Sequence, residues 1–239
     1  MKILIIGGTG GIGSALVDHF LKTNPSAIVF ATYHSKQPQK DHDRLQWFQL
    51  DATSDLEVQA LAARLSKETK NLDILLNTTG FLHNNERKPE KSISEFDPDF
   101  FLLNVQKNVL PTMLLAKHFS KLLKSDKNTH FVSLSARIGS IEDNRIGGWV
   151  SYRSSKAALN MAIKTISIEW QHKLSKCRVF AFHPGTTDTD LSKPFQKNVP
   201  ESKLFKPEYV ARCLAEFIES SDTKKSGHLY SFDGSEIPW

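Results

Sequence analysis

Residues 6–13 read Ile6-Gly7-Gly8-Thr9-Gly10-Gly11-Ile12-Gly13 and lie between a short apolar run and a stretch with helical periodicity. Glycines suit such a turn because a backbone without Cβ atoms can adopt positive φ and approach a pyrophosphate closely. The start of the following helix offers free N–H groups and a partial positive charge to phosphates. A Walker-type loop would end in Gly-Lys-Ser/Thr, and Gly13-Ser14-Ala15 lacks the lysine. The turn therefore predicts a dinucleotide site, with a tight strand–helix turn that binds nothing as the alternative.

On either side of this turn, short apolar runs alternate with longer stretches of helical periodicity, which is typical of β-α units around a parallel sheet. The predicted strands are Lys2–Ile6, Ala27–Thr32, Leu45–Leu50, Leu72–Leu76, His130–Leu134, Arg178–Phe182 and Leu229–Phe232. The predicted helices are Ile12–Lys22, Asp55–Lys67, Pro98–Lys124, Val150–Leu174 and Pro207–Glu219. We expect residues 1–239 to form one α/β domain, a doubly wound Rossmann-type parallel sheet of about seven strands flanked by helices.

Two segments, Phe81–Glu95 and Thr186–Lys206, interrupt this alternation with polar residues and prolines. Loops of this length in a compact domain more often serve a function than fill space, although a disordered excursion is the alternative. We expect residues 186–206 to form a lid over the substrate.

Composition narrows the classes of protein to which the chain can belong. Lys plus Arg (31) exceeds Asp plus Glu (26), which gives a net charge of +5. The basic residues are spread out, without a dense basic run among aromatic residues, so we expect no nucleic-acid partner. The apolar run Ile3–Ile6 is too short for a signal peptide or a membrane span, so we expect a cytoplasmic protein with no membrane partner. Cys177 and Cys213 are expected to be reduced, buried thiols.

Tyr152 and Lys156 form the strongest chemical signal, because residues four apart on a helix lie on one face. The pKa of a tyrosine is normally about 10, so a phenol that exchanges protons near neutrality needs help. A neighbouring ammonium stabilises the phenolate, and the same lysine can hold a ribose. Such pairs also occur on solvated helices, but the glycine turn upstream favours a catalytic pair.

The spacing of Gly7, Gly11 and Gly13, with three residues and then one residue between them, resembles that of the short-chain dehydrogenase/reductase family. Asp51-Ala52 follows the third predicted strand, where the resemblance implies contact with an adenine. Asn77-Thr78-Thr79-Gly80 is similar to the family's Asn-Asn-Ala-Gly, which supports the sheet and lines the cofactor site, although its second and third residues are changed here. The resemblance implies a nicotinamide dinucleotide cofactor.

The end of the second predicted strand bears on the choice between NADP(H) and NAD(H). An acidic side chain there would accept hydrogen bonds from a ribose 2′-OH and repel a 2′-phosphate. The run Thr32-Tyr33-His34-Ser35-Lys36 has no carboxylate, and Ser35 and Lys36 can meet a phosphate. We therefore expect NADP(H) to be favoured over NAD(H), whereas a merely polar strand end would leave the preference weak or reversed.

The resemblance implies two further catalytic residues. Asn104, in an apolar helical run, fits the asparagine that holds a water in the proton relay, and a purely structural hydrogen bond is the alternative. The family serine that binds the substrate carbonyl falls on Ala136 when Gly139 is matched to the family's glycine. Ser135, one residue earlier, is our candidate, and Ser140 or no serine at all are the alternatives.

The segment after the sixth predicted strand, Pro184-Gly185-Thr186-Thr187-Asp188-Thr189, looks like the family's segment that binds the nicotinamide carboxamide. The Thr187 backbone and the Thr189 hydroxyl are the implied contacts, and a plain Pro-Gly turn is the alternative. In all, the residues expected to bind the cofactor are Gly7, Gly8, Thr9, Gly11, Ile12, Gly13, Tyr33, His34, Ser35, Lys36, Asp51, Ala52, Asn77, Thr78, Gly80, Lys156, Pro184, Gly185, Thr187 and Thr189.

Residues 135–149 and the ending Ile237-Pro238-Trp239 resemble the C-factor-like branch of the family, which holds cell-signalling proteins as well as carbonyl reductases. The implied function is hydride transfer between the nicotinamide and a carbonyl/alcohol pair, with Tyr152 as general acid in reduction and general base in oxidation. The rival hypothesis is a dinucleotide-binding signalling or regulatory protein with little turnover.

The expected partners are a small carbonyl or alcohol substrate and further copies of the chain. Family members pair through two long central helices, here Pro98–Lys124 and Val150–Leu174, so the resemblance implies a homodimer or homotetramer. His83, His118 and His183 lack metal-ligand spacing, so we expect no metal.

Overall fold

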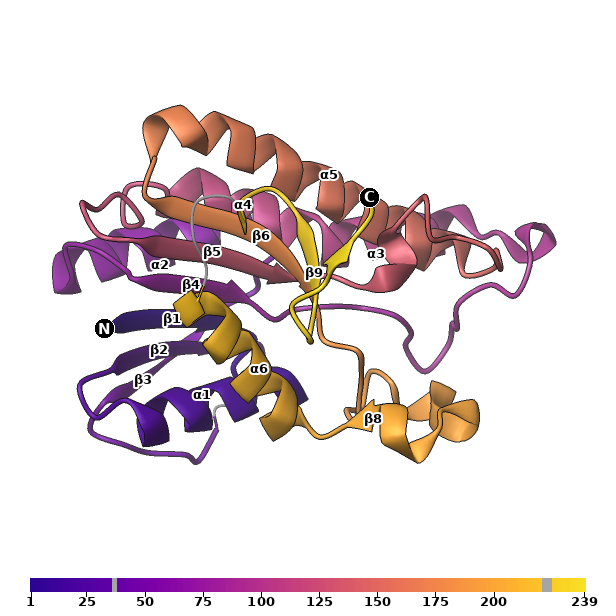
Figure 1. Ribbon diagram of the computed structural model, residues 1–239, viewed down its shortest axis with the longest axis horizontal. Helices are drawn as coiled ribbons and strands as arrows, with labels where there is room; N and C mark the ends of the chain where they lie inside the picture. Colours follow the sequence, from indigo (N-terminus) through magenta and orange to yellow (C-terminus); the bar gives the residue numbers. More distant parts are fainter. Residues whose placement is uncertain (36–37, 221–224) are drawn as a thin grey trace.

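The computed structural model describes residues 1–35, 38–220 and 225–239. Its centre is an eight-stranded sheet with the order β10-β9-β6-β5-β4-β1-β2-β3, and helices cover both faces (Figure 1). The strands are β1 (Lys2–Ile6), β2 (Ile28–Tyr33), β3 (Leu45–Gln49), β4 (Ile74–Asn77), β5 (Thr129–Leu134), β6 (Cys177–His183), β9 (Leu229–Ser231) and β10 (Glu236–Ile237). The helices are α1 (Gly11–Thr23), α2 (Asp55–Glu68), α3 (Pro98–Asn108), α4 (Leu110–Phe119), α5 (Val150–Lys173) and α6 (Pro207–Ser220).

The doubly wound α/β fold is confirmed by the order of the strands. The chain passes from β1 outward to β2 and β3, then returns to β4 on the other side of β1 and continues to β5 and β6. The direction of winding thus reverses between β1 and β4, and open α/β sheets bind their ligands at the carboxyl ends of the strands at such a point.

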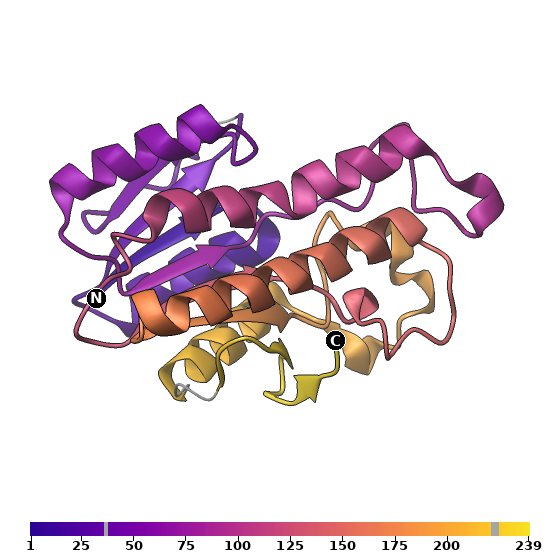
Figure 2. The same cartoon turned by 90° about the horizontal axis from the view of Figure 1, so that it is seen from above.

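Helices α1 and α6 pack together on one face of the sheet, and α2, α4 and α5 cover the other. Figure 2 shows α3 and α4 end to end alongside α5. Strand β1 is buried on both faces, because Leu4 and Ile6 belong to the apolar cluster under α4 and α5 while Ile3 and Ile5 belong to the cluster under α1 and α6. This double burial explains why the strand reads as a continuous apolar run.

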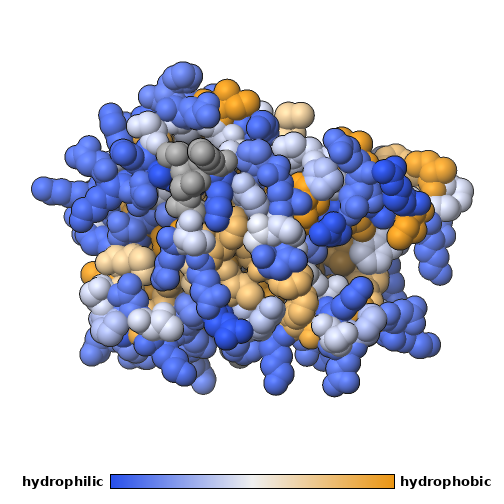
Figure 3. Space-filling model, in the orientation of Figure 1, coloured by the Kyte–Doolittle hydropathy of each residue, from blue (hydrophilic) through white to orange (hydrophobic). Residues whose placement is uncertain are grey.

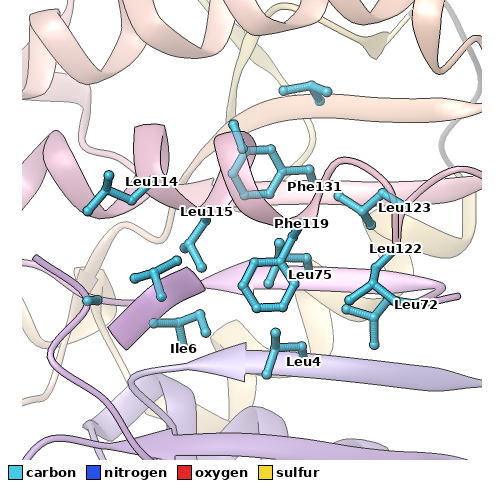
Figure 4. Packing of buried hydrophobic residues seen from close by; sticks show 14 of the residues in the cluster. Leu4, Ile6, Leu72, Leu75, Leu114, Leu115, Phe119, Leu122, Leu123 and Phe131 are labelled. Carbon is cyan, nitrogen blue, oxygen red and sulfur yellow. The ribbon is translucent and has the colours of Figure 1, made fainter. Parts of the chain in front are cut away.

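The larger apolar cluster joins the sheet to α4. Figure 4 shows Leu4 of β1, Leu75 of β4 and Phe131 of β5 gathered with Leu115 and Phe119 of α4. All five side chains are buried. Hydrophilic residues cover most of the outer face shown in Figure 3. No helix in the described ranges combines the length and the apolar character that a bilayer crossing requires.

The helix predicted at Pro98–Lys124 is broken, because α3 ends before Val109 and α4 begins after it. Pro111 has no N–H to donate to the carbonyl of Lys107, and its ring crowds that carbonyl. The last intact bond before the break runs from Val109 N to Val105 O at 2.9 Å. Helical periodicity continues across the proline, so the apolar pattern alone did not reveal the break.

Two further predictions need correction. Within the described residues the sheet has eight strands rather than about seven. The two-residue strand β10, which pairs antiparallel with β9, is too short to show an apolar pattern. The segment Thr186–Lys206, predicted as a loop, contains the short parallel strands β7 (Thr186–Thr187) and β8 (Leu204–Phe205) and two 3-10 helices, η3 (Lys193–Asn198) and η4 (Glu201–Lys203).

Candidate active site

A cavity of about 920 Å³ opens at the carboxyl ends of β1, β4, β5 and β6, next to the point where the winding reverses. It is lined by the glycine turn after β1, by residues 134–138 at the end of β5 and by residues 183–192 at the end of β6. Helix α5 adds the side chains of Tyr152 and Lys156 to the same wall. The topology therefore brings segments from across the whole chain to one place.

The glycine turn is compact because its backbone doubles back on itself. Gly7 has a φ of 80°, and its oxygen accepts a hydrogen bond from Gly10 N at 3.0 Å. A Cβ atom on Gly13 would lie 2.2 Å from that same oxygen, so only glycine fits there. Helix α1 begins at Gly11 without a side-chain cap, and its first turn lines the cavity. Free N–H groups and the helix dipole at this end suit the pyrophosphate of a dinucleotide.

The structure brings part of the predicted cofactor set to the cavity wall. The residues on the wall are Thr9, Gly11, Ile12, Gly13, Thr78, Gly80, Lys156, Pro184, Gly185, Thr187 and Thr189. The residues away from it are Gly7, Gly8, Tyr33, His34, Ser35, Asp51, Ala52 and Asn77. Lys36 lies outside the described residues. Gly8 faces Ala31 and Trp47, each 2.9 Å from where its Cβ would lie, so this glycine serves packing.

The Asp51 carboxylate makes hydrogen bonds within its own turn: its Oδ1 accepts from Thr53 N at 2.9 Å and from Thr53 Oγ1 at 2.7 Å. The Thr53 hydroxyl is the main reason that the pKa of Asp51 is lowered. An ionised carboxylate in a tight turn of this kind holds the backbone after β3 in place.

Tyr152 and Lys156 lie one turn apart on α5 and are 7% and 3% exposed. Lys156 Nζ lies 5.8 Å from the centre of the Tyr152 ring and donates a hydrogen bond to Leu134 O at 3.1 Å. Burial raises the pKa of the Tyr152 phenol and lowers the pKa of Lys156 to about 8. At neutral pH the wall therefore presents a protonated phenol beside a mostly charged ammonium.

Asn104 is fully buried on α3 and does not reach the cavity wall. Its Nδ2 donates to Phe100 O at 2.9 Å within its own helix, the structural hydrogen bond that was the alternative for this residue. Asn108, one turn later, makes the longer-range contacts: Phe81 N donates to its Oδ1 at 2.7 Å, and its Nδ2 donates to Phe81 O at 2.9 Å and to Ser155 Oγ at 3.0 Å. Sequence reasoning missed Asn108, although the same apolar helical run contained it.

Ser135 lies on the cavity wall but is only 4% exposed, and its hydroxyl donates to Asn160 Oδ1 at 2.6 Å. Asn160 Nδ2 in turn donates to Gly139 O at 3.3 Å, which fixes the orientation of the amide. Ser140 Oγ accepts a hydrogen bond from Asp143 N at 3.1 Å, and Ser140 does not line the cavity. Ala136 does line it. The Ser135 hydroxyl proton is thus already used in the hydrogen bond to Asn160. Asn160 is a second residue that sequence reasoning missed.

Residues 1–200 of this chain match the short chain dehydrogenase family. The 1-hydroxy-2-glutathionyl-2-methyl-3-butene dehydrogenase of Rhodococcus sp. is 32% identical over 192 residues, which cover 80% of this chain and 78% of that protein. The C-signal protein of Myxococcus xanthus is 32% identical over 106 residues, or 44% of this chain and 58% of that protein. The NADPH-bound carbonyl reductase from chicken fatty liver superposes with a TM-score of 0.87 at 23% identity, covering 100% of this chain and 94% of that one.

We expect Gly13→Ala to lower the free energy of unfolding by about 1–3 kcal/mol or more, because the new Cβ would press on the Gly7 oxygen and the turn would have to move. The same movement should weaken dinucleotide binding. Urea unfolding and a fluorescence titration with NADPH measure the two effects.

Gly10→Ala is the matched control, because a Cβ at Gly10 would meet only the Gly7 oxygen, at an ordinary 3.4 Å. Its unfolding free energy should stay within about 0.5 kcal/mol of wild type. An equal loss of stability in both variants would show that the crowding at Gly13 is not the cause.

Proposed function

Because the chain belongs to the short-chain dehydrogenase family of NAD(P)(H)-dependent oxidoreductases, we propose that it transfers a hydride between NADP(H) and a small carbonyl/alcohol pair. The observation that carries the proposal is the pair Tyr152 and Lys156, buried together on the wall of a cavity that the glycine turn also lines. The cofactor, when bound, supplies or accepts the hydride.

Tyr152 acts as the general acid in reduction and the general base in oxidation. Its raised pKa keeps the phenol protonated at neutral pH, so a proton is available for the carbonyl oxygen. Lys156 supplies the positive charge that stabilises the phenolate left behind, and an interaction between buried groups is screened less than one in water. The two residues therefore work as one unit.

The carbonyl oxygen is held by the Tyr152 hydroxyl without a serine donor. Three observations support this choice among the alternatives: the Ser135 proton goes to Asn160, Ser140 does not line the cavity, and Ala136 has no hydroxyl. A missing donor of this type lowers the rate but leaves the type of reaction unchanged.

Asn108, in place of Asn104, is the positioning residue for this site. It binds both the N–H and the oxygen of Phe81, which fixes the chain just after β4. A Cβ atom on Gly80 would lie 3.9 Å from Asn108 Oδ1 and 3.9 Å from Lys156 Nζ, so both side chains face that residue. Asn108 thus holds the segment that lies against the catalytic ammonium.

The preference for NADP(H) rests on the end of β2. Tyr33, His34 and Ser35 follow one another there without a carboxylate to repel a 2′-phosphate. The chicken carbonyl reductase of the same fold has NADPH bound. The similarity to C-signal suggests a rival function, signalling with little turnover. The experiment below distinguishes this function from hydride transfer.

A homodimer or homotetramer would use the outer faces of the central helices. Leu102 on α3, Met113 on α4 and Ile168 on α5 are 62%, 51% and 53% exposed. Large apolar side chains on neighbouring helices are the type of surface that a second copy of the chain would cover.

A titration with NADPH and with NADH, followed by a panel of aldehydes and ketones, tests the proposed function. Tyr152→Phe should lower kcat by about 10²–10⁴ because the general acid is lost, while NADPH binding stays as in wild type. NADPH binding by wild type without turnover on any carbonyl would favour the signalling protein. Failure to bind either nucleotide would rule out both functions.

The pH dependence of activity should follow the protonation of Lys156. A pKa of about 8 means that the ammonium is charged below pH 8 and neutral above it, so kcat/KM for NADPH should fall as the pH rises through about 8. Lys156→Arg, whose guanidinium stays charged, should have lower activity but no fall in this range. A wild-type profile that stays level up to pH 9.5, roughly 1.5 units above that pKa, would exclude Lys156 as the titrating group.

Ala136→Ser tests the missing serine donor. The added hydroxyl would face the cavity, and we expect it to raise kcat by about tenfold or more. Ser135→Ala is the control and should cost far less turnover than Tyr152→Phe, because its hydroxyl serves Asn160. If Ser135→Ala removed turnover as fully as Tyr152→Phe, Ser135 would be the carbonyl donor after all.

A further inference from the structure

The turn before α5 has an unusual backbone. Gly147, Gly148 and Trp149 follow one another with φ values of 70°, 66° and 53°, and Trp149 is the one non-glycine residue with positive φ in the described part of the chain. L-amino acids with large side chains disfavour this left-handed region, so the surrounding structure must hold Trp149 there. Such a conformation at the edge of a cavity points to a role for the side chain that it aims.

Glu90 holds one side of this turn from the loop between β4 and α3. Its backbone oxygen accepts a hydrogen bond from Trp149 N at 2.6 Å. Its carboxylate is buried, with the residue 3% exposed, and accepts hydrogen bonds from Ser151 Oγ and, at 3.3 Å, from Ser151 N. Helix α5 has no side-chain cap of its own, so the Glu90 carboxylate takes that place at the positive end of the helix.

Arg153 holds the other side of the same turn. Its guanidinium donates to Gly148 O at 2.9 Å and to Gly147 O at 3.1 Å. Glycine suits position 148, because φ is 66° there and a Cβ would lie 3.0 Å from the oxygen of Lys91. The turn is thus clamped between α5 and the loop that carries Glu90, and Figure 2 shows the beginning of α5 beside these segments.

This conformation places the Trp149 indole on the cavity wall, close to Tyr152. Its ring centre lies 6.4 Å from that of Tyr152 and 4.9 Å from that of Phe195, at an angle of 61° to the Phe195 ring. His83 packs on Phe195 at 5.5 Å and bonds to Leu191 O at 3.2 Å. Trp149 and Phe195 both line the cavity, and we call these two side chains the aromatic wall.

We propose that the aromatic wall selects flat aromatic aldehydes and ketones, and that Glu90 is the positioning residue that aims Trp149 at them. The proposal rests on the proposed function, because it places the substrate carbonyl at Tyr152. A ring attached to that carbonyl would then lie within reach of the Trp149 indole. Aromatic rings attract each other through edge-to-face contacts beyond the burial of area, whereas a saturated ring of the same size gains only the burial.

The test compares benzaldehyde with cyclohexanecarbaldehyde, which differ in aromaticity and little in size. The quantity measured is the ratio of their kcat/KM values, taken for each variant relative to wild type so that intrinsic reactivity cancels. Trp149→Gly, which suits the left-handed backbone, should lower this ratio by about three- to tenfold, mostly through KM for benzaldehyde. Trp149→Phe should keep most of the ratio, and its retained ring provides a second variant should Trp149→Gly fold poorly.

Glu90→Gln should lower the ratio in the same direction, because the amide cannot accept both Ser151 hydrogen bonds as the carboxylate does. The double variant Glu90→Gln/Trp149→Gly should then show no further fall relative to Trp149→Gly, because Glu90 acts through Trp149. Glu86→Gln, an exposed change in the same loop, is the matched control and should leave the ratio unchanged.

An unchanged ratio in Trp149→Gly, with cyclohexanecarbaldehyde still reduced, would overturn the aromatic selectivity and leave the proposed function standing. A further fall in the double variant would overturn the role of Glu90 alone. No oxidation of NADPH by wild type with either aldehyde or any other carbonyl would overturn the proposed function and this inference with it.

Discussion

Helix α5 packs against the turn after β5 so closely that no side chain fits between them. A Cβ atom on Gly139 would lie 2.7 Å from Lys156 Cβ and 2.8 Å from the Lys156 carbonyl carbon. This approach allows Lys156 Nζ to reach Leu134 O and Asn160 Nδ2 to reach Gly139 O. The helix is thereby fixed to the carboxyl end of a central strand, and the place of Tyr152 beside the cavity follows from that contact.

A chain of buried hydrogen bonds joins the other elements of the site. Asn77 at the end of β4 donates to Thr112 Oγ1 on α4 at 2.9 Å, and Thr112 pairs with Ser133 on β5 at 2.9 Å. Asn77 Oδ1 also accepts from Thr79 N and from the Thr79 hydroxyl. Buried polar groups are costly unless paired, so this chain sets one relative position of β4, α4 and β5. Asn77 serves the site by holding the chain rather than by lining the cavity.

The sheet could be predicted well because parallel strands covered on both faces read as continuous apolar runs. Tyr152 and Lys156 could be predicted to share a face because their spacing of four depends on local geometry alone. Asn104 and Asn108 are four apart in the same way, so helical periodicity cannot tell which of them meets the site. The contacts of Asn108 with Phe81 and Ser155, which depend on the tertiary structure, separate the two. Local rules thus predicted elements and pairs, whereas contacts across elements assigned the remaining roles.

Burial favours the neutral form of both members of the proposed catalytic pair, Tyr152 and Lys156. In the proposed reaction, burial keeps the Tyr152 proton in place until a carbonyl oxygen can take it, but it also makes the resulting phenolate costly. Lys156 offsets that cost because a pKa of about 8 leaves its ammonium mostly charged at neutral pH. With the Ser135 proton donated to Asn160, the pair must provide both the proton and the countercharge in the proposed reaction. In that reaction their contributions would be coupled, and neither residue could be assigned a share of the rate by itself.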